Sequence, residues 1–326
     1  MIKVTVVGFH GALASAITGV ADLFSMTGAS WNRIQNQDIQ RLFTIQIASE
    51  DGQYIQCING IKIQADVSFK DIQQADIVVV PTIGAPIEEV LASNPQVIDF
   101  IKLANQNQWI IAGNCTGNFF LAEAGILNHK VATTHWGFKG LFEQRYPSVE
   151  LKTDQLITRA DHIYCAGGGL AWFDVGLHLI ERFYGFEISI QTAKSFVIDY
   201  RRESQLSYSL MRISKPHHDE LVQTIQQWIE HNFAEQFTLE QLALRFNVTL
   251  RTLIRPFKSA LDLPPNRYIQ IIRIEAAQKR LEETEQAIDT IMQSVGYLDP
   301  SSFRRLFRTK TGLTPLEYRR RFSRRL

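Results

Sequence analysis

The first 200 residues alternate between two hydrophobic patterns. Short and nearly continuous apolar runs, such as IVVV (77–80), are followed by longer stretches with helical periodicity. Apolar runs of this kind are typical of strands whose two faces are both covered. The alternation therefore predicts an α/β domain with a doubly wound parallel sheet of flavodoxin-like form. The runs expected to form strands are 2–9, 42–49, 75–82, 109–113, 130–135 and 162–167, and helices are expected at 86–106 and 118–126.

From about residue 218 onward the pattern is helical throughout. Two segments, 237–265 and 286–318, each contain a short amphipathic helix, a tight turn and a second helix with arginines beside an apolar stripe. This is the sequence form of a helix-turn-helix unit, whose second helix enters the major groove of DNA. Thr238 and Thr249 are expected to cap the two helices of the first unit. The pattern predicts an all-α domain with two such units.

A third helix is predicted between the two units, over 266–284. At 1.5 Å per residue it spans about 27 Å. Adjacent major-groove faces repeat at about 34 Å. A strut of this length is of the right scale to hold two recognition helices on one face of DNA.

The α/β alternation is lost over residues 187–216, and we place the domain boundary near 200–216. RRES (201–204) is a charge cluster, and KP (215–216) is a break signal. We therefore predict an N-terminal domain over 1–200, a linker over 201–217 and a DNA-binding domain over 218–326.

The overall net charge is +1. The charge of each half of the chain is more informative than this total. Residues 216–326 hold 17 basic and 13 acidic residues, and the remainder holds 17 basic and 20 acidic residues. A basic tail behind an acidic front indicates that only the tail meets a polyanion. A solvated basic surface is the alternative interpretation.

The sequence has three cysteines: Cys57, Cys115 and Cys165. A small, odd number of cysteines argues against a disulfide framework and favours a reducing compartment. The chain begins directly with a strand-like run and shows no signal-peptide pattern. No stretch approaches the roughly 18 apolar residues of a membrane span. We expect a soluble cytoplasmic protein without a membrane partner.

The motif GNCTG (113–117) lies between a predicted strand and a predicted helix, in the form of a nucleophile elbow. A helix N-terminus at this position favours a thiolate at Cys115. A thiol nucleophile also needs a base within hydrogen-bond reach. Thr116 cannot act as that base, and His135 is the best remaining candidate. Catalysis, ligand sensing and a purely structural turn remain open, and we favour sensing.

Asp174 lies inside an otherwise apolar helical segment, AWFDVGLHL (171–179). Its carboxylate either stabilises the helix start or lies at a pocket wall or a dimer interface. AGGGL (166–170) permits a close approach of the backbone, for packing or for a ligand. We predict a ligand pocket that contains Cys115, Thr116, His135 and Asp174, with no catalytic residue, no metal ion and no cofactor.

The front half resembles the class I glutamine amidotransferase-like superfamily of PfpI and ThiJ proteins over about 1–190. The resemblance rests on GNCTGNFFLAEAGIL (113–127), TTHW (133–136) and AGGGLAWFDVGLHLIERFYG (166–185). Many enzymes of this superfamily carry a histidine directly after the cysteine and an acidic residue in the first strand–helix connection. Here Thr116 follows the cysteine, and the acid aligns with Ala16. The resemblance therefore implies a retained pocket without the enzyme activity.

In the back half, the recognition helices keep an apolar stripe for the core and leave polar side chains for DNA. In the first, Leu250, Leu253 and Phe257 point inward; in the second, Phe303, Leu306 and Phe307 do. Pro256 is unusual because an interior proline removes a helical hydrogen bond and kinks the axis. The predicted DNA-binding residues are Arg251, Thr252, Arg255, Lys258, Ser301, Ser302, Arg304 and Arg305.

This half resembles the AraC/XylS family of bacterial transcription regulators over about 218–322, with both helix pairs, the strut RIEAAQKRLEET (273–284) and their spacing. By motif match, the resemblance places Arg251 and Arg255 of the first recognition helix at base-reading or phosphate-contacting positions. It does the same for Ser301 and Arg305 of the second. An amidotransferase-like sensor joined to this reader is similar to the GlxA-type group.

These features together predict a transcription regulator that responds to a small metabolite. We expect promoter DNA, a small-molecule effector, a second copy of the chain and RNA polymerase as its partners, and activation rather than repression. The competing interpretation is a Cys-dependent hydrolase or hydratase of the PfpI/ThiJ type with an appended DNA-binding module. A pure interaction module is a third alternative, which the two arginine-bearing helices disfavour.

Overall fold

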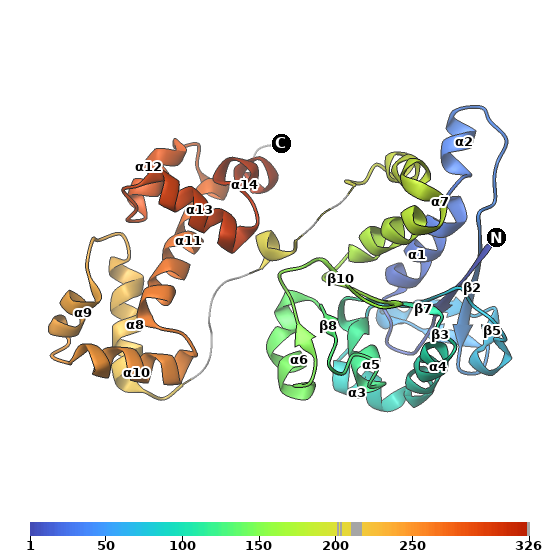
Figure 1. Ribbon diagram of the computed structural model, residues 1–326, viewed down its shortest axis with the longest axis horizontal. Coiled ribbons are helices and arrows are strands. Elements are labelled where there is room, and N and C mark those ends of the chain that lie inside the picture. The colour runs from blue at the N-terminus through green and yellow to red at the C-terminus, as the bar shows by residue number, and fades with distance from the viewer. Residues whose placement is uncertain (201, 203, 210–216, 325–326) are drawn as a thin grey trace. The chain divides into compact units, whose positions relative to one another are not determined.

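The computed structural model describes residues 1–200, 202, 204–209 and 217–324 (Figure 1). The chain forms two compact units, Met1–Gln205 and Leu206–Leu326, and each is described by itself. Residues 201, 203 and 210–216 of the expected linker lie outside the described residues, so the boundaries 200 and 217 stay predictions.

The first unit is built on a seven-stranded sheet with the order β10-β11-β7-β6-β1-β2-β5. Neighbouring strands are parallel except for β10 and β11, which are antiparallel. All four residues of the central strand β6 are buried, as its continuous apolar run predicts. The predicted parallel sheet is confirmed. Its strands are β1 Ile2–Val7, β2 Phe43–Ser49, β5 Val67–Ser68, β6 Ile77–Val80, β7 Ile110–Asn114, β10 Ile157–Ala160 and β11 Ile163–Ala166.

Helices cover both faces of this sheet (Figure 1). Helix α1 packs with α7 and against β1 and β2, while α4 and α5 pack together and against β7. This double cover explains why the central strands are apolar on both sides. The helices are α1 Ala14–Met26, α2 Ser30–Ile34, α3 Ile87–Ser93, α4 Pro95–Gln106, α5 Asn118–Glu123, α6 Lys139–Arg145 and α7 Ala171–Phe196.

Two expected elements of this unit differ from the structure. The expected helix 86–106 is divided into α3 and α4 at Asn94, because Pro95 disfavours helical geometry for the residue before it. The expected strand 130–135 is reduced to β8, Val131–Ala132, which pairs with β9, Glu150–Leu151, outside the main sheet. Smaller strands β3 Tyr54–Gln56 and β4 Lys62–Gln64 form a separate antiparallel pair that the pattern did not predict.

Helix α7 is interrupted at Gly185, where the backbone leaves helical geometry. Beyond this point the chain folds back along the first half of the helix, so that the hydroxyl of Ser189 donates to the carbonyl of Leu177 at 2.7 Å. The ring of Phe173 packs against that of Phe196, with centroids 6.1 Å apart. The two parts of α7 thus form a helical hairpin.

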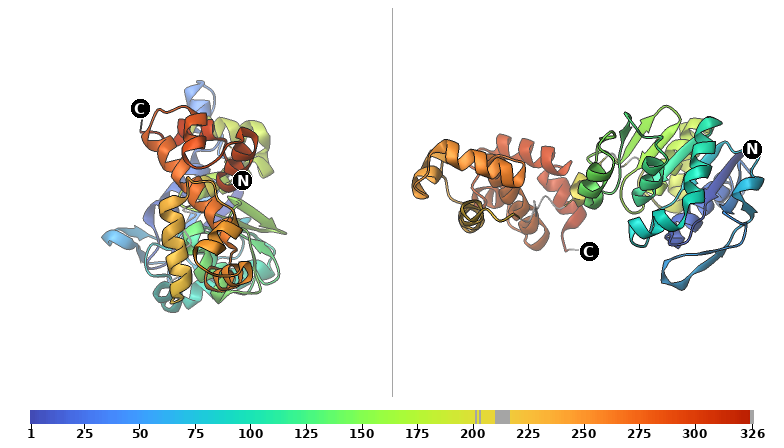
Figure 2. Two further views of the ribbon diagram at one scale, coloured as in Figure 1. Left: turned by 90° about the vertical axis from the view of Figure 1, so that its left-hand side faces the viewer. Right: turned by 90° about the horizontal axis from the view of Figure 1, so that it is seen from below.

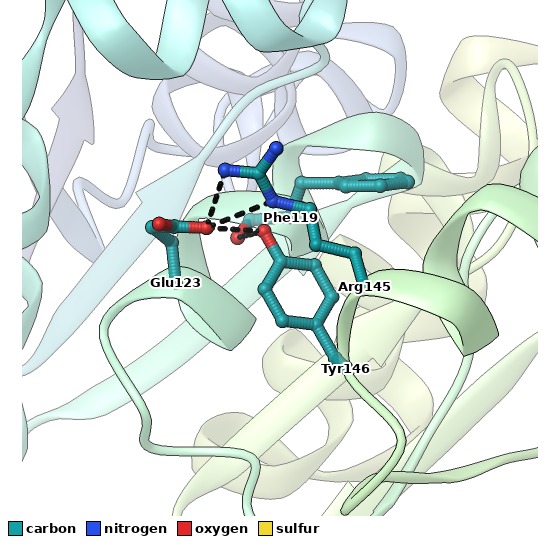
Figure 3. A network of polar contacts seen from close by, with 4 residues as sticks. All are labelled: Phe119, Glu123, Arg145 and Tyr146. Carbon is teal, nitrogen blue, oxygen red and sulfur yellow. Dashed lines mark hydrogen bonds and ion pairs between the residues drawn. The ribbon is translucent and has the colours of Figure 1, made fainter.

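A polar network ties the end of α5 to the end of α6 (Figure 3). The Arg145 guanidinium donates to Glu123 Oε2 from Nε at 3.2 Å and from Nη2 at 3.1 Å. The hydroxyl of Tyr146 donates to the same oxygen at 2.5 Å. Burial and the neighbouring carboxylate raise the pKa of the Tyr146 phenol. Because α5 follows the GNCTG motif directly, this network fixes the helix behind the elbow.

The second unit contains seven α-helices within its described residues: α8 Glu220–Asn232, α9 Leu239–Arg245, α10 Leu250–Leu261, α11 Pro265–Glu283, α12 Ile288–Ser294, α13 Pro300–Thr311 and α14 Pro315–Phe322. They form two helix-turn-helix units, as predicted, with α10 and α13 as the recognition helices. Thr238 caps α9 through a capping box with Gln241, and Thr249 caps α10 through the N–H of Thr252 at 3.1 Å.

The long helix α11 passes between the two groups of helices (Figures 1 and 2) and contributes to both of their cores. Tyr268 and Ile269 of its first half pack with α8, α9 and α10. Ile274 and Leu281 of its second half pack with α12, α13 and α14. One rigid helix therefore fixes the spacing of the two units.

Arg273 of α11 adds a polar connection between the two groups. Its guanidinium donates to Phe233 O at 2.8 Å, to Glu235 O at 2.8 Å and to Gly296 O at 3.1 Å. These carbonyls lie beyond the end of α8 and in the turn between α12 and α13. Within the described residues, no helix of the chain combines the length and apolar content needed to cross a bilayer.

Candidate nucleic-acid interface and sensor site

Helix α10 presents the first predicted DNA-reading surface. Leu253, Phe257 and Leu261 are buried against α8, α9 and α11. The opposite side is open to solvent, and the predicted residues Arg251, Thr252, Arg255 and Lys258 are exposed there. The helix is continuous from Leu250 to Leu261, so Pro256 does not end it.

Helix α13 presents the second surface with the same division. Phe303 and Phe307 are buried, while Ser301, Arg304 and Arg305 are exposed and Ser302 is half-buried. Asp299 caps the helix by accepting from the N–H of Ser302 at 2.7 Å. Hydrogen bonds from Ser302 lower the pKa of the Asp299 carboxyl, so the cap is charged at neutral pH.

The Arg304 guanidinium lies 3.9 Å from the carboxylate of Asp289 in α12, with both side chains largely exposed. An ion pair of this kind contributes little in water. All eight predicted DNA-binding residues are therefore accessible on the recognition helices. Their contact with DNA stays a prediction.

Cys115 lies at the sharp turn between β7 and α5, with a φ of +56°. A Cβ at Gly117 would lie 2.3 Å from Pro81 O, so the motif needs glycine at this position. Cys115 is 5% exposed. Burial raises the pKa of the Cys115 thiol, and hydrogen bonds from Gly169, Thr116 and Thr82 only oppose this effect. The helix N-terminus predicted a thiolate, whereas the burial found here favours the neutral thiol.

The polar side chains near Cys115 are hydrogen-bonded to backbone groups of neighbouring loops. The hydroxyl of Thr116 donates to Ile83 O at 2.9 Å, and that of Thr134 donates to Cys115 O at 2.9 Å. His135 Nδ1 accepts from the N–H of Gly137 at 3.0 Å, and partial burial lowers the pKa of the imidazole. Among the residues that the structure describes, no histidine ring is hydrogen-bonded to the Cys115 thiol.

Asp174 lies in the first turn of α7. Its carboxylate is almost fully buried and pairs with the guanidinium of Arg202, whose Nε donates to Oδ1 at 3.0 Å. Burial raises the pKa of the Asp174 carboxyl, and Arg202 opposes this rise. The pair borders a cavity of about 280 Å³ that is also lined by Ile157, Leu177, His178, Glu181 and Tyr200. The structure thus groups Cys115, Thr116 and His135 around neighbouring loops and gives Asp174 a different partner.

The sequence patterns missed Arg202, which lies in the charge cluster RRES, and Gln205, which follows it. Neither belongs to a periodic segment, and no motif marks them. Ala16, at the position aligned with the acid of the superfamily's enzymes, is buried in α1.

Comparisons with known proteins agree with both units. Residues 18–181 match the DJ-1/PfpI family, and residues 242–321 match a helix-turn-helix domain. The chain is 27% identical over 290 residues to the HTH-type transcriptional regulator CdhR of Pseudomonas aeruginosa, which covers 88% of this chain and 84% of that one. It is 25% identical over 292 residues to the HTH-type transcriptional regulator GbdR of the same organism, with 88% and 77% covered.

Among solved structures, a putative transcriptional regulator protein from Vibrio parahaemolyticus superposes with a TM-score of 0.51 at 20% identity. The superposition covers 59% of this chain and 97% of that one, which supports the fold of the first unit. The chain belongs to the DJ-1/PfpI family and joins this domain to an AraC-type pair of helix-turn-helix units.

Proposed function

We propose that the chain is a sequence-specific DNA-binding transcription regulator. The observation that carries the proposal is the pair of helices α10 and α13, which bury one face and expose arginine and hydroxyl side chains on the other. Arginine pairs bidentately with guanine, and serine or threonine contacts bases or phosphates. The similarity to two named transcriptional regulators extends over 88% of the chain and so includes its first unit.

The residues proposed to contact DNA are those expected from the sequence. The proposed contacts with the first major groove come from Arg251, Thr252, Arg255 and Lys258. The proposed contacts with the second major groove come from Ser301, Ser302, Arg304 and Arg305. Because α11 joins the two cores as one helix, both recognition helices address the same stretch of duplex.

We propose further that the first unit binds a small metabolite near Cys115 and is not an enzyme. The strained turn at Cys115 has the backbone geometry of a nucleophile elbow. However, the thiol is buried, its pKa is raised, and Thr116 occupies the place of the adjacent base. A hydrolase or hydratase turnover that disappears in Cys115→Ser would overturn this part of the proposal.

The partners follow from this function. We propose a homodimer that binds two copies of its site in promoter DNA and activates transcription through contact with RNA polymerase in the cytoplasm. Sedimentation of the chain with and without a duplex of one or two sites tests the stoichiometry.

The proposed function is tested by binding of the full chain to its native upstream DNA. Specific binding is expected to weaken steeply as salt rises, because basic side chains displace counterions from the phosphates. A scrambled duplex of equal length and composition is the control. Equal affinity for both duplexes at low salt would contradict sequence-specific regulation.

A further inference from the structure

The side chain of Gln205, the last residue of the first unit, is enclosed by that unit. It is 2% exposed. Its Oε1 accepts hydrogen bonds from the backbone N–H groups of Trp136 at 3.3 Å and Gly168 at 3.1 Å. Its Nε2 donates to the carbonyl of Thr134 at 2.8 Å. Longer contacts from Nε2 reach Thr133 Oγ1 at 3.3 Å and Gln155 O at 3.4 Å.

Two glycines of the AGGGL motif leave the space for this carboxamide. A Cβ on Gly167 would lie 2.6 Å from Gln205 Nε2. A Cβ on Gly168 would lie 2.6 Å from His135 Cδ2 and 3.4 Å from Gln205 Oε1. The close backbone approach that the motif permits is therefore used to hold an amide group beside His135.

The loops that hold Gln205 also hold the elbow. The backbone of Gly169, the residue after Gly168, is hydrogen-bonded to the Cys115 thiol. The hydroxyl of Thr134 donates to Cys115 O at 2.9 Å. The carboxamide site and the elbow thus share two loops.

Two residues shortly before Gln205 are also bonded to the first unit. Arg202 is paired with Asp174, and the hydroxyl of Ser204 donates to Asp154 O at 2.7 Å. The next residue, Leu206, begins the second unit. Gln205 is therefore the last residue of the first unit, and it directly precedes the second unit.

We propose that the Gln205 carboxamide is a built-in occupant of a binding site for a small primary amide. A free ligand with this group displaces Gln205 and releases the chain ahead of the DNA-binding unit. The site offers two N–H donors to one oxygen and a carbonyl acceptor to one nitrogen. A primary amide satisfies both, whereas a carboxylate has no donor for Thr134 O and an ammonium has no acceptor for the N–H groups. This inference rests on the proposed function, because it names the effector class of the same regulator.

The test uses the full chain and acetamide as the probe. In the wild type the tethered amide competes with acetamide, so the site is free only in a small fraction of molecules. Gln205→Ala removes the competitor, and we expect it to bind acetamide at least about tenfold more tightly than the wild type does. Titrations followed by thermal unfolding or ligand-observed NMR measure the affinity. Gln106→Ala, an exposed glutamine of α4, is the matched control and should behave as the wild type.

Acetate, measured in parallel, should bind Gln205→Ala more weakly than acetamide. Equal acetamide affinity in the variant and the wild type, no binding to the variant, or tighter binding of acetate would each overturn the proposal. If Gln205→Ala does not fold, the proposal is tested on the wild type instead. The rate at which chymotrypsin cleaves after Leu206 and Tyr208 is then measured. Acetamide should accelerate that cleavage and acetate should not; an unchanged rate would overturn the proposal.

Neither measurement involves DNA. Failure of the full chain to bind its upstream DNA would contradict the proposed function and leave the amide site standing. An absent amide site would leave DNA binding standing.

Discussion

The recognition helices α10 and α13 lie fifty residues apart in the sequence and bury corresponding positions. Leu253 corresponds to Phe303, and Phe257 to Phe307, and all four are buried. Each helix is followed by a helix that begins with proline and carries a tyrosine three residues later. Tyr268 donates to Glu230 at 2.6 Å, and Tyr318 donates to Glu282 at 2.7 Å. The scaffold is the same in both because both must fill the same kind of small core.

The exposed and half-buried positions differ. The first helix has Ile254 and Pro256 where the second has Arg304 and Leu306. The helix before α10 is capped by Thr238, whereas Ala287 provides no side-chain cap for α12. Packing thus restricts the buried positions, and the outer positions are free to give each unit its own DNA chemistry. From these differences we expect α13 to contribute more to DNA binding than α10. Helix α9 has a side-chain cap, and α12 has none.

The largest expected effect comes from the shared core positions. Phe257→Ala and Phe307→Ala should each lower the free energy of unfolding of the second unit by about 3–5 kcal/mol, because each leaves a cavity. Denaturant unfolding of the full chain, followed by signals from each unit, measures the loss. Leu316→Ala, at a side chain that is 46% exposed, is the control. A negligible loss for one phenylalanine would show that the two cores are not equivalent.

Pro256 is the next point at which the two helices can be compared. Pro256→Leu, which introduces the residue found at position 306, should restore the helical hydrogen bond to Thr252 O and stabilise the unit by up to about 3 kcal/mol. Pro256→Arg should also tighten DNA binding and make the salt slope more negative by about one unit, because it adds a phosphate contact. If both variants leave stability and binding unchanged, the proline does not impair the first reader.

Arginine substitutions compare the two helices in DNA binding. Arg305→Ala should cost about 1–3 kcal/mol of specific binding and relax the preference at one base position. Arg251→Ala should cost less, since α10 contains the proline. Affinities for the native duplex and for single-base variants measure both effects. A uniform loss on every duplex would instead make Arg305 a phosphate contact, and a larger loss for Arg251→Ala would reverse the order of the two readers.

The caps give the smallest effect. Thr238→Ala should cost about 1 kcal/mol of stability, because the side-chain oxygen accepts from the N–H of Gln241. Ala287→Thr offers the missing cap to α12 and should change stability in the opposite direction by a smaller amount. Thermal unfolding measures both, with Thr238→Ser as the variant that keeps the cap. No loss for Thr238→Ala would show that the capping box is dispensable.

Local patterns determined much of this molecule. The continuous apolar run at Ile77–Val80 predicts a strand covered on both faces, and the structure buries all four of its residues. The helical stripe of Leu253 and Phe257 separates the core side of α10 from its exposed arginines, and Thr249 marks its start. Such features depend on the period of side chains along one element, so the sequence alone contains them.

Only the tertiary structure decided the partners of the polar groups in the first unit. Asp174 pairs with Arg202 rather than with the elbow, and Gln205 reaches the N–H groups of Trp136 and Gly168. Burial raises the pKa of Cys115 where its place at a helix start predicted the reverse. Each outcome depends on residues far apart in sequence that the fold brings together. A periodic pattern records which face of an element is buried, but it does not record which distant polar group meets it there.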